Sequence, residues 1–282
     1  MALQKPPTPV TTPVVVAPDI GPSPKAAIGW LAGGAALTFA VSWLGTTVLG
    51  LQHDLYYLIY FTFALGYLDW FATRSHIAWH EVLRRNVWWS LAVGVLVAFA
   101  VARQVMGQDG TPHPHGGFFG FELVWRGVIY GTVDALTLFV FPAAAAYLVL
   151  RGNRNGLPRK AAFAGLVLLF SLVVSTTYHL GYSTYRGSDL SKPLIGTVMM
   201  DVPAILTGNP AGAIVAHATM HTTAVVHQYY GGDKTNRALP PELSSSYPDR
   251  PGGTAALAVA AGWVVLIGAV LALNRRRIRE LL

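Results

Sequence analysis

Apolar runs close to 20 residues long recur along this chain, separated by short polar stretches. A helix needs a run of that length to cross the hydrocarbon core of a bilayer. The pattern predicts an all-α fold, a polytopic integral membrane helix bundle with about eight transmembrane helices. The predicted spans are Ala26–Gly50, Asp54–Ala72, Asn86–Met106, Gly117–Leu150, Ala161–Tyr182, Pro193–Thr207, Ala211–Tyr229 and Thr254–Leu273.

The segment before the first span has a different composition. Met1–Lys25 holds seven prolines with Thr and Val between them and has no compact apolar core. Such a segment buries too little apolar surface to fold, so we predict a disordered, proline-rich cytoplasmic tail. Residues 26–282 then form a single transmembrane domain.

The basic residues sit in short loops and at the C-terminus instead of covering one face. The net charge of +7 is therefore a topology signal, and we expect no nucleic-acid partner. With about eight spans, three basic clusters fall on the same side of the membrane, near residues 74–85, 151–160 and 275–279. This predicts that both termini are cytoplasmic, in a protein of the bacterial cytoplasmic membrane.

Composition limits the chemistry of any site. Apolar residues make up 53% of the chain and charged residues only 12%. This composition predicts that most of the protein surface contacts the lipid bilayer. The chain has no cysteine, so disulfides, thiolate metal sites, iron–sulfur clusters and a cysteine nucleophile are excluded. A metal ion has to be held by His, Asp or Glu.

Ionisable side chains inside the predicted spans stand out because burial in a bilayer is costly for them: Asp, Arg or Lys costs about 2.5–3.5 kcal/mol at mid-span even on lenient insertion scales. They mark candidate functional positions. They are Glu122, Arg126, Asp134, His179, Asp201, His217, His221 and His227.

Spacing divides these positions into pairs. Glu122 and Arg126 are four residues apart, so they share a helical face and can neutralise each other. His217 and His221 have the same spacing, and two imidazoles on one face can ligate one metal ion. With His179 they predict a polar pocket in the outer half of the bilayer, whose metal ligands are His179, His217, His221 and Glu122.

The order of these residues resembles the CPBP family of intramembrane proteases, also called the CAAX-protease and bacteriocin-processing family. Its members carry EExxxR, FxxxH and HxxxN or HxxxH motifs on successive membrane helices. The matching stretches here are Phe121–Gly127, Ser175–His179 and His217–His221. The resemblance covers residues 117–227 and implies a CPBP-like core at about 117–228 with intramembrane, metalloprotease-like endopeptidase activity.

The resemblance also implies roles for individual residues. Glu122 would act as general base, held by Arg126, while His179 shares the water or binds Zn or another divalent metal, and His217 with His221 stabilises the oxyanion. The family's first glutamate is replaced by Phe121. A shift of one position turns a side chain by about 100°, so Glu122 can replace that glutamate only where the helix is distorted.

Two other functions fit the same residues. The histidines can hold a redox metal, or a haem between two helices, in a membrane oxidoreductase. Alternatively, the loss of the first glutamate is typical of a degenerate family member that acts as a scaffold or accessory subunit for partner subunits. The protease hypothesis requires a membrane-protein substrate in place of partner subunits.

Overall fold

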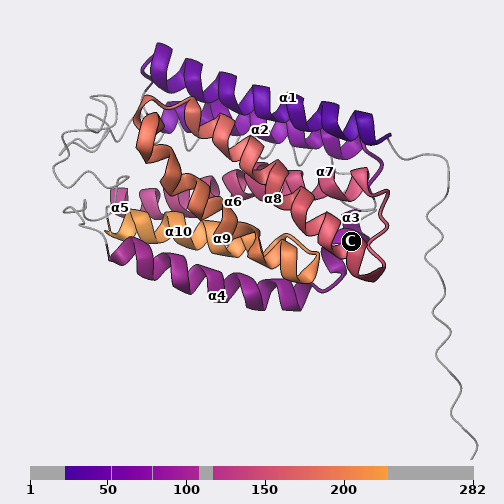
Figure 1. Cartoon of the computed structure of the whole chain (residues 1–282). Coiled ribbons are helices and arrows are strands. Elements are labelled where there is room, and N and C mark those ends of the chain that lie inside the picture. The colour runs from indigo at the N-terminus through magenta and orange to yellow at the C-terminus, as the bar shows by residue number, and fades with distance from the viewer. Residues whose placement is uncertain (1–22, 52, 78, 108–116, 228–282) are drawn as a thin grey trace, which may run out of the picture.

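The computed structural model describes residues 23–51, 53–77, 79–107 and 117–227 (Figure 1). All regular structure in these ranges is helical, which confirms the all-α prediction. Most of the proline-rich tail and the predicted eighth span, Thr254–Leu273, lie outside the described residues.

Four helical stretches are long and apolar enough to cross a membrane. They are Pro24–Val48, Val87–Met106, Phe119–Val149 and Gly156–Leu180. Four such helices are consistent with an integral membrane protein. The first continues α1 (Pro24–Ser42) into a π-helical segment, and the second and fourth are α4 and α8.

The other predicted spans in the described part are helices that miss one of these two requirements: one is long enough but not apolar enough, and two have only 17 residues. They are α2 (His53–Arg74), α9 (Ser191–Thr207) and α10 (Ala211–His227). The short α3 (Trp79–Arg84) lies between α2 and α4. About eight spans therefore remain a prediction.

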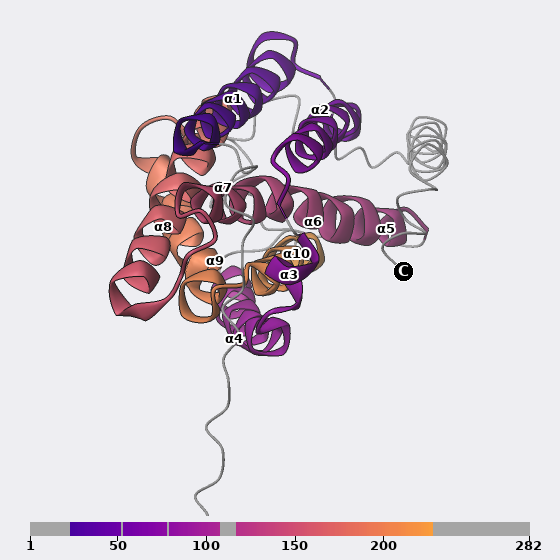
Figure 2. The ribbon, with the colours of Figure 1, turned by 90° about the vertical axis from the view of Figure 1, so that its right-hand side faces the viewer.

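One helix runs through the middle of the bundle, with α1 and α2 on one side and α4, α9 and α10 on the other (Figure 2). It consists of α5 (Gly117–Glu122), α6 (Tyr130–Ala135) and α7 (Phe141–Val149), joined by the π-helical segments Leu123–Ile129 and Leu136–Val140. Of its most apolar window, 78% is buried. A buried polar side chain on this helix therefore needs a hydrogen-bond partner inside the protein.

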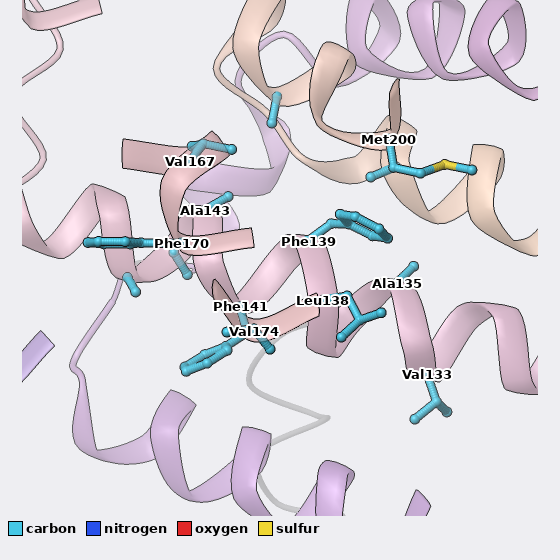
Figure 3. Close-up of a cluster of buried hydrophobic side chains, with 14 of the residues drawn as sticks. Val133, Ala135, Leu138, Phe139, Phe141, Ala143, Val167, Phe170, Val174 and Met200 are labelled. Carbon is cyan, nitrogen blue, oxygen red and sulfur yellow. The ribbon is translucent and has the colours of Figure 1, made fainter. Parts of the chain in front are cut away.

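Apolar side chains of the central helix fix it against α8 and α9. Figure 3 shows Val133, Ala135, Leu138, Phe139, Phe141, Ala143, Val167, Phe170, Val174 and Met200 in one buried cluster. This packing sets the height and rotation of α6, which carries Asp134.

Glycines allow α10 to approach its neighbours closely. A Cβ at Gly94 of α4 would collide with the backbone of Gly212 in α10, and a Cβ at Gly131 of α6 would lie 2.7 Å from the Cα of Ala218. In lipid the hydrophobic effect does not drive helices together, so membrane helices associate largely through close packing at small residues of this kind. The backbone of α10 is thereby held against both α4 and α6.

Asn209 closes one end of the bundle, between α9 and α10. Its Nδ2 donates to the carbonyl oxygens of Leu83 and Arg85 at 2.7 and 2.8 Å, and its Oδ1 accepts from the backbone N–H of Ala211. The turn before α10 is thus tied to the segment before α4, which fixes where α10 begins.

Candidate metal centre

Three ligand atoms from two packed helices converge on one point. Asp134 Oδ2 lies 3.2 Å from His217 Nε2 and 3.9 Å from His221 Nε2, and the two Nε2 atoms are 3.2 Å apart. All three side chains present one ligand atom within 4.8 Å of the others. We call Asp134, His217 and His221 the triad.

The triad forms because α6 and α10 touch at a glycine. Gly131 lies one turn before Asp134, and its missing side chain leaves room for Ala218 and for the Cβ of His221, 3.2 Å from the place a Cβ would occupy. The four-residue spacing of the two histidines places both rings on the face of α10 that meets α6. Their ring centroids are 4.7 Å apart.

A tyrosine from α2 orients the carboxylate. The hydroxyl of Tyr60 donates to Asp134 Oδ1 at 2.7 Å, which leaves Oδ2 directed at the histidines. The Tyr130 ring meets the His221 ring edge to face at 4.6 Å. Asp134 and His217 are almost fully buried, whereas the side chain of His221 is 21% exposed. The triad is therefore approached from the His221 side.

Hydrogen bonds alone cannot satisfy the bare triad. If His217 donates its Nε2 proton to Asp134, that nitrogen cannot also accept from His221. If His221 donates to His217, Asp134 Oδ2 receives no proton from His217. In the described part of the chain His217 Nδ1 has no hydrogen-bond partner. A cation bound by all three atoms removes this conflict, so the triad can hold a metal ion.

The predicted Glu122–Arg126 pair forms, at 2.6 Å, but with a third member. Arg126 also donates from Nε and Nη2 to both carboxylate oxygens of Asp54 in α2, each at 2.9 Å. Glu122 is the last residue before the π-helical segment, so the helix is distorted at this position. The Glu122 carboxylate nevertheless contacts Arg126, and it has no atom in the triad.

His179 lies near the end of α8 and is likewise absent from the group of converging ligand atoms. Its Nδ1 is 2.7 Å from the carbonyl oxygen of Ser175, one turn earlier. The structure thus joins Glu122 with Arg126 and His217 with His221, but it does not bring all five predicted site residues together.

Tyrosines fill the space beside the triad. Their hydroxyls form a continuous chain from Tyr130 to Tyr178 at 2.5 Å, from Tyr178 to Tyr182 at 2.6 Å, and from Tyr182 to Tyr56 at 2.7 Å. Aromatic rings of this kind cover a polar site with apolar surface while satisfying their own hydroxyls. They shield the triad from the side of α2 and α8.

The sequence identified Asp134 as an ionisable residue in a predicted span but did not indicate that it contacts the histidines. It missed Tyr60 and Asp54. Asp134 is far along the chain from the histidines that it contacts, Tyr60 is far from Asp134, and Asp54 is far from Arg126. Nothing in the local spacing of these residues indicates the contacts. The only available signal was the cost of leaving Asp134 unpaired inside a membrane helix.

Comparison with protein-family models, with curated proteins and with solved structures finds no match to this chain.

Proposed function

We propose that this chain is a membrane-embedded metalloprotein whose triad binds Zn²⁺ and hydrolyses a bond in a membrane-protein substrate. The geometry of the triad supports the metal, and the resemblance to intramembrane proteases supports the reaction. The two parts are separable and are tested separately.

The single observation behind the proposal is the spacing of the three ligand atoms. Ligands at the usual Zn–N and Zn–O lengths on a tetrahedral ion lie about 3.4 Å apart. The triad edges are 3.2, 3.2 and 3.9 Å. Neighbouring ligands on an octahedral ion at similar bond lengths lie closer, about 3 Å apart. The longest edge therefore favours the tetrahedral ion.

Three protein ligands leave a fourth position, as catalytic zinc sites do. Asp134 and His217 are almost fully buried and His221 is partly exposed, so water and substrate would reach a bound ion past His221. When bound, Zn²⁺ lowers the pKa of a coordinated water and so supplies a nucleophile. Tyr60 holds the Asp134 carboxylate in the ligating orientation.

In this proposal the ion cluster around Arg126 has a structural role. Its guanidinium binds Asp54 bidentately and Glu122 through Nη1, which ties α2 to the central helix beside the tyrosines. This departs from the family resemblance, which makes Glu122 the general base. Asp134 takes the place of Glu122 and His179 among the metal ligands.

Hydrolysis is tested in proteoliposomes that contain the purified protein loaded with zinc and a membrane-protein fraction. We expect new peptide N-termini with wild type and with His227→Ala, a histidine of the same helix outside the triad. Asp134→Asn should produce none. If wild type and Asp134→Asn give the same N-termini, the hydrolase part of the proposal fails. Metal binding is tested separately, by the metal content of the purified protein.

A second candidate function rests on the composition of the triad. Two histidines and one carboxylate also form the ligand set of non-haem Fe(II) oxygenases. An oxidoreductase is favoured if the purified protein holds iron in place of zinc. An optical spectrum of the same sample also reports haem, the remaining oxidoreductase alternative.

The scaffold alternative rests on Phe121, whose ring stacks on Trp125 at 6.0 Å in the position of the family's first glutamate. A protein that binds no metal and copurifies with partner subunits would support it. For all of these functions we propose the bacterial cytoplasmic membrane as the location, with about eight spans and both termini in the cytoplasm.

A further inference from the structure

A second buried polar region lies between α8 and α9. It consists of four side chains that are at most 2% exposed, Ser171, Ser175, Thr197 and Asp201. The two members on each helix are four residues apart, so each pair lies along one line of its helix. We call this row the α8–α9 seam. It shares no residue with the triad or with the Arg126 cluster.

The seam has two hydrogen-bonded rungs. Ser171 Oγ donates to Asp201 Oδ1 at 2.9 Å, and Thr197 Oγ1 donates to Ser175 Oγ at 2.7 Å. One turn beyond Ser175 along α8, His179 Nδ1 lies 3.3 Å from Ser175 Oγ. His179 is only partly buried, so the seam runs from a partly exposed imidazole to a fully buried carboxyl.

One carboxylate oxygen of Asp201, at the buried end of the seam, has no hydrogen-bond partner among the described residues. This oxygen, Oδ2, is buried, and Asp201 makes no ion pair in the described part of the chain. No ionisable side chain on the helices packed against α9 is its counterion. Those side chains are Arg159, Lys160 and His179 on α8, Arg103 on α4, His217, His221 and His227 on α10, and Asp189 in the 3-10 turn before α9. Lys192, on α9 itself, pairs with Asp189 at 3.3 Å.

A buried carboxylate ion without a counterion costs several kcal/mol, whereas a neutral carboxyl with one hydroxyl partner costs far less. Asparagine could accept the same hydrogen bond from Ser171 and has no group that titrates, so a purely structural role does not require an aspartate here. We propose that Asp201 is a proton-binding site inside the bundle, and that protons reach and leave it along the α8–α9 seam from the end at His179.

The step is an acid–base equilibrium. The Asp201 carboxylate gains a proton to become the neutral acid, and the O–H bond breaks again on release. The serine and threonine hydroxyls can both accept and donate, so they can pass a proton on without a net change. The inference is independent of metal binding and of hydrolysis, because no ligand of the triad takes part.

The test is infrared spectroscopy of the full-length protein in proteoliposomes, as a difference between wild type and Asp201→Asn. We expect a carbonyl band of a neutral carboxyl that Asp201→Asn removes, that shrinks as the pH is raised, and that shifts within minutes in D₂O. A band that is absent, that keeps its size at every pH at which the protein is folded, or that does not shift in D₂O overturns the proposal.

The route is tested by removing hydroxyls from the seam. Ser175→Ala, or the isosteric Thr197→Val if the first variant folds poorly, should slow the D₂O shift several-fold. Thr177→Ala removes an α8 hydroxyl whose bonds go only to the backbone carbonyls of Val173 and Val174, and it should leave the rate unchanged. Equal rates in wild type and both seam variants overturn the route.

Discussion

At the scale of single residues, the hydroxyl of Tyr60 is the group outside the triad with the clearest role. It donates to the oxygen of Asp134 that does not face the histidines. Partners that orient a metal ligand are typically worth a factor of about 10–100 in metal affinity. We expect Tyr60→Phe to weaken Zn²⁺ binding by that factor, as measured by calorimetric titration of the detergent-solubilised protein.

The matched control is Tyr67→Phe, in the same helix. Its hydroxyl donates to the backbone carbonyl of Trp30, away from the triad, so zinc affinity should not change. Equal affinities of Tyr60→Phe and wild type would show that Asp134 needs no help from α2.

Arg126 is the residue whose loss should cost most stability. It is 5% exposed and holds two carboxylates that would otherwise repel each other in the interior. Breaking a buried ion pair on one side costs about 3–5 kcal/mol. We expect Arg126→Met to lower the free energy of unfolding by that amount, and the exposed Arg103→Met to change it little.

Adding Asp54→Asn and Glu122→Gln to Arg126→Met should restore most of the loss, because no uncompensated charge is then buried. Thermal unfolding in detergent measures both effects. A triple variant as unstable as Arg126→Met would mean that the arginine acts through packing and not through its charge.

The same residue scale explains what the sequence could predict of the site. His217 with His221 and Glu122 with Arg126 are local pairs, and a spacing of four residues was enough to join them. Asp134 lies 83 residues from His217, and Asp54 lies 72 residues from Arg126. Contacts at such separations depend on how helices pack, which the spacing of residues along a single sequence does not report.

At the scale of secondary-structure elements, the approach of α6 to α10 determines whether the triad exists. A Cβ at Gly131 would lie 2.7 Å from Ala218 Cα and 3.2 Å from His221 Cβ. Gly131→Ala must therefore push the helices apart, at an overpacking cost of about 1–3 kcal/mol. We expect lower zinc occupancy in this variant, measured by elemental analysis of the purified protein.

Gly66→Ala in α2 is the control, because a Cβ there meets no atom within 4 Å. Its zinc occupancy should equal that of wild type. Full occupancy in Gly131→Ala would contradict the claim that close contact between α6 and α10 builds the site.

The helices themselves were largely predictable, since long apolar runs bounded by Gly, Pro and charged residues fix where a helix can lie. The π-helical segments Leu123–Ile129 and Leu136–Val140 were not. They interrupt the α-helical hydrogen-bond pattern on both sides of α6, so a period of 3.6 residues does not give the face on which Asp134 lies. No local composition signal marked them.

At the scale of the whole molecule, the bundle has two distinct ends. Asn86 Nδ2 donates to the Thr207 carbonyl, which places the α9 C-terminus beside the start of α4. At the other end, Thr47 Oγ1 donates to the Gly181 carbonyl and the hydroxyls of Tyr56 and Tyr182 meet. If the bundle crosses the membrane, these two ends face opposite compartments.

The absence of cysteine makes this orientation directly testable. Single cysteines in place of the exposed Arg84 and Asn153 should react with a membrane-impermeant maleimide from the cytoplasmic side only. A cysteine at the exposed Ser183 should react from the opposite side only. Labelling of all three from one side would contradict the predicted topology.

The measurement that tests the central claim most directly is the metal content of the detergent-purified protein, with Co²⁺ substituted for zinc to report the coordination geometry. We predict close to one zinc ion per chain in wild type and in His227→Ala, loss of the ion in Asp134→Asn and in His217→Ala/His221→Ala, and a tetrahedral Co²⁺ spectrum. A folded wild-type protein that takes up no metal even when zinc is supplied, or that holds it equally well without the two histidines, would contradict the account.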